Sequence, residues 1–209
     1  MSNDYQPYPD VRSNRFYNLL FCDIPGGYTA WSKGPLRPLF DSAFDEKAVR
    51  SLADDKNNES RMRALAYSRL KAEHCAIPPR ILLGVIVETP LPRGLDTLAT
   101  YTDGRIRYIN GTGRRATIEK DVPSLRAPRQ ALLSAAQEVV DELTPIEDIR
   151  SPPPQAGNVR ITSVVSDGLY VGEANLEALT RDPLGGPVLR ATSDLMNAVL
   201  EYSKANKPR

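Results

Sequence analysis

The sequence predicts an α+β fold, in which an antiparallel β-meander sheet is covered by amphipathic helices. Three observations lead to this prediction. Strand-length segments separated by turn residues follow one another through residues 80–119. Segments with the apolar period of helices stand before and after this run, and a further strand pair fits residues 159–173. Strands and helices grouped in this way, rather than strictly alternating, are typical of α+β proteins.

The first half of the chain reads as one strand, two helices and another strand. Arg15–Asp23 (RFYNLLFCD) is an aromatic and leucine-rich run of strand length that stops at a proline-glycine turn. A helical pattern begins at Ser42, and a second helix is expected from Glu59 to Cys75. Arg80–Glu88 (RILLGVIVE) is apolar at both parities, which predicts a central strand covered on both faces.

The register of the meander follows from its two turns. If Asp103-Gly104 is a two-residue hairpin turn, Tyr101 pairs with Ile106. If residues 111–113 (GTG) form the next loop, Ile118 also pairs with Ile106, and Glu119 lies opposite Arg105 as a cross-strand charge pair.

Alternation of side chains then divides the meander into two faces. An apolar face is expected from Ala99, Tyr101, Ile106, Tyr108, Ala116 and Ile118. The opposite face carries the three arginines Arg105, Arg107 and Arg115, and we expect it to be open to solvent or to a partner.

The second half continues with a helix, a hairpin and a last helix. The helix is expected over Pro128–Leu143, and the hairpin turns at Asp167-Gly168. The last helix has Pro187 near its start. The full order is therefore β-α-α-β-β-β-β-α-β-β-α. This order of strands and helices resembles small regulatory folds of the profilin-like or roadblock kind.

The length of 209 residues suits one domain. We expect residues 1–14 to be a flexible N-terminal arm, residues 15–205 to form the domain, and residues 206–209 to be a short tail. Residues 145–158 contain three consecutive prolines and are expected to form a proline-rich connector within the domain.

Composition and charge argue against several classes of protein. The 27 basic and 26 acidic residues give a net charge of +1, whereas proteins that grip nucleic acid usually carry a strong basic excess. Two cysteines do not make a secreted disulfide framework. The longest apolar run is far shorter than a membrane span. We therefore expect a soluble, cytoplasmic protein that does not contact a membrane.

Candidates for catalysis are few, and they are Cys22, Asp23 and His74. A thiol nucleophile needs a base within hydrogen-bond reach, and His74 is the single histidine. The alternative interpretation makes Cys22 a small buried apolar residue and His74 a favourable charge at a helix C-terminus. The paired spacing of zinc ligands is absent, so no metal site and no cofactor are expected.

Three functions remain open. The leading hypothesis is a non-catalytic protein-interaction or regulatory module that binds a protein partner through the arginine face and a loop around Trp31. The second is an enzyme or small-ligand-binding protein with a pocket near the 24–41 loop that uses Cys22, Asp23 or His74. The third is nucleic-acid binding through the arginine face.

Overall fold

The computed structural model describes residues 4–23, 26–28, 33–92, 94–146 and 150–206. It confirms the predicted α+β class. The helices are α1 (Val11–Asn18), the 3-10 helix η2 (Gly34–Leu39), α2 (Glu46–Asp54), α3 (Ser60–Ala72), α4 (Pro123–Glu142), α5 (Leu176–Arg181) and α6 (Gly185–Ala205). The strands are β1 (Leu82–Leu91), β2 (Gly94–Tyr101), β3 (Ile106–Ile109), β4 (Arg115–Ile118), β5 (Asn158–Val165) and β6 (Gly168–Asn175).

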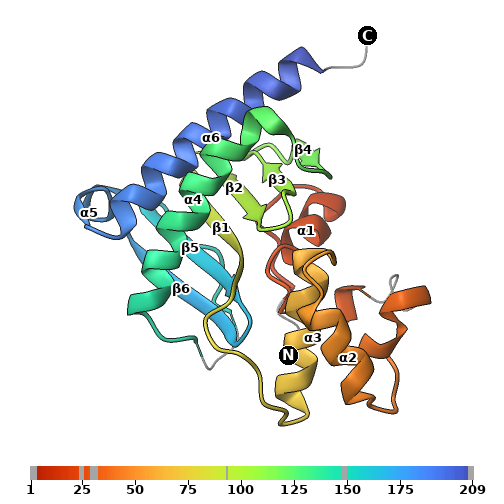
Figure 1. Ribbon diagram of the computed structural model, residues 1–209. Coiled ribbons are helices and arrows are strands. Elements are labelled where there is room, and N and C mark those ends of the chain that lie inside the picture. The colour runs from red at the N-terminus through yellow and green to blue at the C-terminus, as the bar shows by residue number, and fades with distance from the viewer. Residues whose placement is uncertain (1–3, 24–25, 29–32, 93, 147–149, 207–209) are drawn as a thin grey trace.

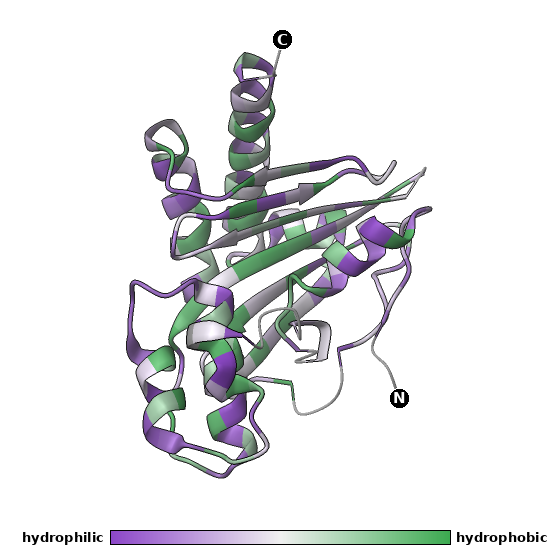
Figure 2. Cartoon of the chain, turned by 90° about the vertical axis from the view of Figure 1, so that its right-hand side faces the viewer, coloured by the Kyte–Doolittle hydropathy of each residue, from purple (hydrophilic) through white to green (hydrophobic). Residues whose placement is uncertain are grey.

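The strands form one antiparallel sheet in the order β4-β3-β2-β1-β5-β6, with helices on both sides (Figure 1). Helices α4 and α6 pack on one face, and α1, α3 and the segment before α1 pack on the other. In β1, Val85 faces α4 and α6 while Ile86 faces the opposite core, and neither is exposed. The central strand covered on both faces is therefore confirmed, and Figure 2 shows hydrophobic stretches along the middle strands.

The chain before the sheet differs from the sequence prediction. Arg15–Asp23 was predicted as a strand, and this is wrong, because α1 ends at Asn18 and a turn follows. Asp10 starts the helix, since its carboxylate accepts a hydrogen bond from the Ser13 amide at 2.9 Å. Residues 4–14 do not form the expected flexible arm, because Tyr8 is buried and its hydroxyl lies 2.7 Å from Thr97 Oγ1 of β2.

The pairing of β2 with β3 is shifted by one residue from the predicted register. Ile106 pairs with Thr100 rather than with Tyr101. The turn is longer than two residues because Asp103 is held by another element: its Oδ2 accepts a hydrogen bond from the Ser60 amide at 2.7 Å, at the start of α3. Ile106 consequently points toward α4 and α6, and Arg107 shares the opposite face with Tyr101.

The β3–β4 hairpin was predicted correctly, whereas the turn of the β5–β6 hairpin was predicted one residue too late, at Asp167-Gly168 instead of Ser166-Asp167. Ile118 pairs with Ile106 across β3 and β4, as expected from the three-residue loop. The hairpin of β5 and β6 is also present, with Val165 paired to Gly168. The predicted last helix is α6, with Pro187 in its first turn, and α5 is an additional short helix before it. Helix α4 begins before Pro128.

Candidate functional site

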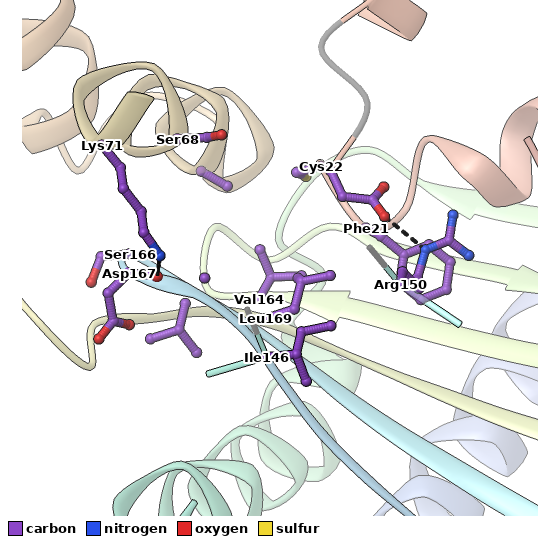
Figure 3. A pocket seen from close by; sticks show the side chains of 14 residues that line it. Phe21, Cys22, Ser68, Lys71, Ile146, Arg150, Val164, Ser166, Asp167 and Leu169 are labelled. Carbon is purple, nitrogen blue, oxygen red and sulfur yellow. Dashed lines mark hydrogen bonds and ion pairs between the residues drawn. The ribbon is translucent and has the colours of Figure 1, made fainter. Parts of the chain in front are cut away.

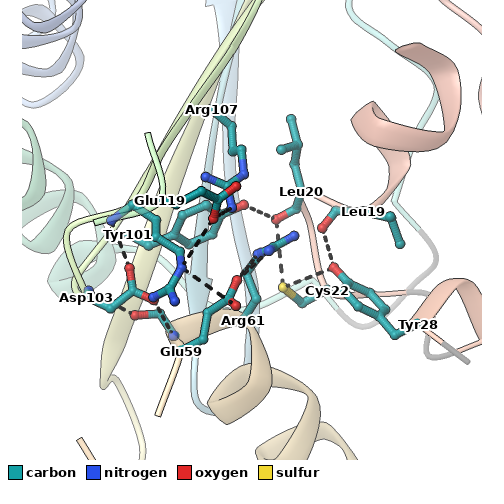
Figure 4. A network of polar contacts seen from close by, with 12 residues as sticks. Leu19, Leu20, Cys22, Tyr28, Glu59, Arg61, Tyr101, Asp103, Arg107 and Glu119 are labelled. Carbon is teal, nitrogen blue, oxygen red and sulfur yellow. Dashed lines mark hydrogen bonds and ion pairs between the residues drawn. The ribbon is translucent and has the colours of Figure 1, made fainter. Parts of the chain in front are cut away.

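The three arginines of the meander do not form one exposed surface. Figure 4 shows Arg107 beside Glu119 within a network of polar contacts. The side chain of Arg107 is only 3% exposed, and its Nη2 lies 2.8 Å from Glu119 Oε2. A second nitrogen donates to the Ile118 carbonyl at 3.1 Å. Because these groups bind the guanidinium inside the fold, Arg107 does not face an external partner.

Arg105 also belongs to this internal network, whereas Arg115 does not. The predicted charge pair is present, with Arg105 Nε 3.6 Å from Glu119 Oε2, and Asp103 Oδ2 lies closer, at 3.1 Å from Arg105 Nη1. Arg115 is exposed, and its guanidinium carbon lies 5.6 Å from the centre of the Phe16 ring. This face of the sheet was expected to be open, but α1 and α3 cover most of it. The alternation of side chains along a strand shows which residues share a face, and it does not show which elements pack on that face.

Cys22 is buried at the turn after α1, where its backbone has a φ of 58°. The Tyr28 hydroxyl donates to its sulfur at 3.6 Å. Burial raises the pKa of the Cys22 thiol to about 12, although Arg61 and the Tyr28 hydrogen bond oppose the shift. The thiol is therefore protonated at neutral pH, which does not suit a nucleophile.

His74 ends helix α3 in a structural role. It is exposed and has a φ of 58°, the left-handed conformation in which many helices terminate. Its amide donates to the Lys71 carbonyl, and the Cys75 amide donates to the Leu70 carbonyl at 2.9 Å, so the last turn is closed. Within the described ranges, no group of three or more His, Cys, Asp or Glu side chains is placed to hold a metal ion.

A cavity of about 290 Å³ lies between α3, the β5–β6 hairpin and Arg150 (Figure 3). Two of the residues proposed from the sequence line it, Cys22 and Asp23, whereas His74 does not. Trp31, the remaining candidate, lies outside the described residues. The cavity adjoins Asp23, but none of its described lining residues belongs to the 24–41 loop, so the pocket of the second hypothesis stays a prediction.

Arg150 is the residue at this cavity that the sequence reasoning missed. Its side chain is 1% exposed although it belongs to the proline-rich connector, and its Nε lies 2.8 Å from Asp23 Oδ2. Its other nitrogens donate to the Tyr17 hydroxyl at 3.3 Å and to Asn18 Oδ1 at 3.1 Å. The guanidinium carbon lies 3.8 Å from the centre of the Phe21 ring. An arginine in a proline-rich run carries no local signal for such burial.

A second hollow, of about 320 Å³, lies between helix α6, the start of α5 and the strands β1 and β2. We call it the α6 groove. Among its lining residues, Leu91 is 45% exposed and Leu176 is 48% exposed. Its apolar lining consists of Val87, Leu91, Leu98, Tyr108, Leu176, Leu189 and Met196.

Comparison with known proteins adds no relative: no protein-family model, no curated protein and no solved structure matches the chain. The resemblance in strand and helix order to profilin-like or roadblock folds stays a prediction. Within the part of the chain that the structure describes, no helix is both long and apolar enough to cross a bilayer.

Burial predicts a clear difference in reactivity between the two thiols: Cys22 is buried and its pKa is raised to about 12, whereas Cys75, whose pKa is also raised, is partly exposed to a reagent. At pH 8 a thiol with a pKa of about 12 is ionised in only about one molecule in ten thousand. We expect iodoacetamide to modify the half-buried Cys75 in the native protein and to modify Cys22 only after unfolding in urea. Mass spectrometry of the intact protein checks this. The variant Cys75→Ser should take up no label when folded and one label in urea, and native labelling of Cys22 at the rate of Cys75 would contradict the assignment.

Proposed function

We propose that the protein is a non-catalytic protein-interaction module whose partner docks in the α6 groove. The single observation that carries this proposal is the exposure of Leu91 and Leu176 in one groove. Four large hydrophobic residues are strongly exposed among the described residues, and these two line the same hollow. Clustered exposed apolar residues are more informative than scattered ones, because they mark surfaces that another molecule covers.

The composition of the groove supports a protein as the occupant. Its apolar floor is bordered by polar and charged groups, among them Asp96 and Arg190. An apolar centre with a polar rim is the usual pattern of protein interfaces. The floor comes from strands β1 and β2 and from helix α6, so the surface is presented by rigid elements rather than by a loop.

The other two hypotheses have less support. Nucleic-acid binding through the arginine face loses its basis, because Arg107 is buried and Arg105 is paired with Asp103. A thiol enzyme loses its nucleophile, because the pKa of Cys22 is raised to about 12. Binding of a small molecule is still supported by the cavity at Arg150.

The proposal is tested by placing charges in the groove. In the double variant Leu91→Asp/Leu176→Asp we expect partner binding to weaken by at least about thirtyfold, as when interface hot-spot residues are lost. Both positions are largely exposed, so the fold should change in stability by only about 0.5 kcal/mol. The measurement is crosslinking of the tagged protein in extracts of its source cells, with captured proteins identified by quantitative mass spectrometry.

The matched control is Leu200→Asp, which charges an exposed leucine of α6 that does not line the groove. Proteins captured by the wild type and by Leu200→Asp but lost with the double variant support the proposal. Capture that is equal in all three proteins, or no specific capture by the wild type, contradicts it. Far-UV circular dichroism confirms that each variant is folded.

A further inference from the structure

We propose that the cavity beside Arg150 binds a small, neutral, polyhydroxylated molecule of the size of a monosaccharide or cyclitol. This site is independent of the α6 groove, which lies on the side of the sheet covered by α4 and α6. The cavity instead opens between α3 and the β5–β6 hairpin. Its volume of about 290 Å³ is at the lower limit of ligand pockets, so the ligand is small.

Polar groups stand at both ends of the cavity and apolar groups lie between them (Figure 3). One end carries Arg150 with Cys22 and Phe21, and the other carries Lys71, Ser166 and Asp167. The middle is apolar, with Val164, Leu169 and Ile146. A ligand that matches this lining has hydrogen-bonding groups at both ends and C–H groups between them.

Two carboxylates of the lining each have one oxygen that accepts no hydrogen bond from the described residues. Asp23 uses Oδ2 for Arg150, and Asp167 uses Oδ2 for the Tyr170 hydroxyl at 3.0 Å, which leaves Oδ1 of each without a donor. A buried acceptor without a donor costs roughly 1–3 kcal/mol. The terminal torsion of aspartate turns easily, so a donor within the cavity can meet these oxygens after a small rotation.

The charges of the lining select a neutral ligand. The lining holds two carboxylates, Asp23 and Asp167, and two cations, Arg150 and Lys71. Arg150 forms an ion pair with Asp23, and Lys71 Nζ donates to the backbone carbonyl of Asp167 at 2.6 Å. A diamine would be attracted by both carboxylates but repelled by both cations. A dicarboxylate would be attracted by both cations but repelled by both carboxylates. A hydroxyl donates and accepts at once, so it can satisfy a carboxylate oxygen and a cationic donor together.

The ring of a sugar or cyclitol also suits the apolar middle of the cavity. Such rings present C–H faces between their hydroxyls, and these faces pack on aliphatic and aromatic side chains without leaving polar groups unpaired. Phe21, Val164 and Leu169 provide that surface here. Hydroxyls at the two ends of the ring then reach the two polar ends of the cavity.

The experiment is saturation-transfer NMR on the full-length protein with glucose, mannose and myo-inositol as probes, and with 1,4-diaminobutane and succinate as charged comparisons. We expect saturation transfer to at least one polyhydroxylated probe, together with a rise in Tm at saturating concentration. Ser68→Trp, an exposed change on α3 that fills the cavity from its wall, should abolish the signal. Asp167→Asn should weaken binding at least tenfold, because a carboxylate acceptor is lost.

The control is Asp194→Asn, an exposed carboxylate of α6 that does not line the cavity, which should leave binding unchanged. The proposal is overturned if none of the three polyhydroxylated probes binds, or if their binding persists unchanged in both Ser68→Trp and Asp167→Asn. Binding of diaminobutane or succinate alone, sensitive to Ser68→Trp, likewise overturns the neutral class of ligand.

Discussion

Replacing Arg150 with alanine is expected to lower the free energy of unfolding by about 3–5 kcal/mol. The guanidinium is buried and is bound by Asp23, Tyr17 and Asn18. Its removal leaves the carboxylate of Asp23 largely buried without a counter-charge, and this uncompensated charge is the main cost. The ring of Phe21 also loses the cation that lies 3.8 Å from its centre.

The loss should be larger than for any exposed arginine, because this residue joins segments that are far apart in the sequence. Asp23 and Asn18 come from the chain around α1, whereas Arg150 comes from the connector before β5. The Tyr5 hydroxyl also donates to the Arg150 carbonyl at 2.6 Å. Arg150 therefore joins the connector to the N-terminal segment, which Tyr8 and Tyr17 in turn join to the sheet.

Urea unfolding followed by circular dichroism measures the effect, with the wild type and two further variants beside it. Arg150→Lys keeps the charge but not the planar set of donors, so it should recover only part of the loss. Arg181→Ala is the matched control, because its pair with Glu177 is exposed, and its effect should stay below about 0.5 kcal/mol. A loss below about 1 kcal/mol in Arg150→Ala would show that the network does not hold the fold. If Arg150→Ala does not fold, Arg150→Lys takes its place in the comparison, and it should lose more stability than Arg181→Ala.

The second large effect is expected at Glu88, which makes stability depend on pH in the direction opposite to most carboxylates. Glu88 lies on β1 with no exposed surface, and the Tyr17 hydroxyl donates to its Oε1 at 2.6 Å. Burial raises the pKa of Glu88, and the hydrogen bond from Tyr17 and the charge of Arg160 only partly oppose this shift. Arg160 Nη1 lies 4.0 Å from Oε2, too far for a hydrogen bond.

The sign follows from linkage between proton binding and folding. Because the folded pKa of Glu88 lies above the unfolded value, the native state binds more protons than the unfolded state between those two values. The contribution of Glu88 to stability is therefore fully present below the unfolded pKa and declines as pH rises through the folded pKa. The decline is about 1.4 kcal/mol for each pH unit within that window.

Glu88→Gln removes the titration and keeps an acceptor for Tyr17. Urea unfolding from pH 4 upward measures the free energy of unfolding of the wild type and of Glu88→Gln. As pH rises, Glu88→Gln should become more stable relative to the wild type. Glu88→Ala should be less stable than Glu88→Gln by roughly 1–3 kcal/mol, because the Tyr17 hydroxyl loses its acceptor. A wild type that gains stability relative to Glu88→Gln on raising the pH would contradict the assignment. Glu177→Gln, an exposed change on α5, is the control.

Local sequence patterns predicted much of the sheet. Apolar residues at both parities identified β1 as a central strand, and the glycine loop at residues 111–113 set the register of β3 with β4. In both cases the deciding interactions lie within one segment or between neighbours joined by a short turn. The pattern for β2 and β3 was equally clear, yet the register was wrong because Asp103 binds the Ser60 amide of α3.

The candidate site was predicted only in part. Cys22 and Asp23 do line a cavity, but the pKa of Cys22 is raised by burial, which depends on residues remote in sequence. Glu88 and Arg150 gave no local indication of their roles, because the end of an apolar strand and a proline-rich connector are both ordinary places for exposed charges. Exposed apolar residues of the α6 groove likewise come from segments that only the fold brings together.

The sequence by itself determined the α+β class, the central strand and the β3–β4 hairpin, since apolar periodicity and turn residues act over a few residues. The tertiary structure alone decided that Arg107 is internal and that Arg150 and Asp23 meet beside a cavity. The physical reason is that burial and ion pairing depend on which segments pack together. A charged residue is open to a partner or locked inside the fold according to neighbours that lie far away in the chain.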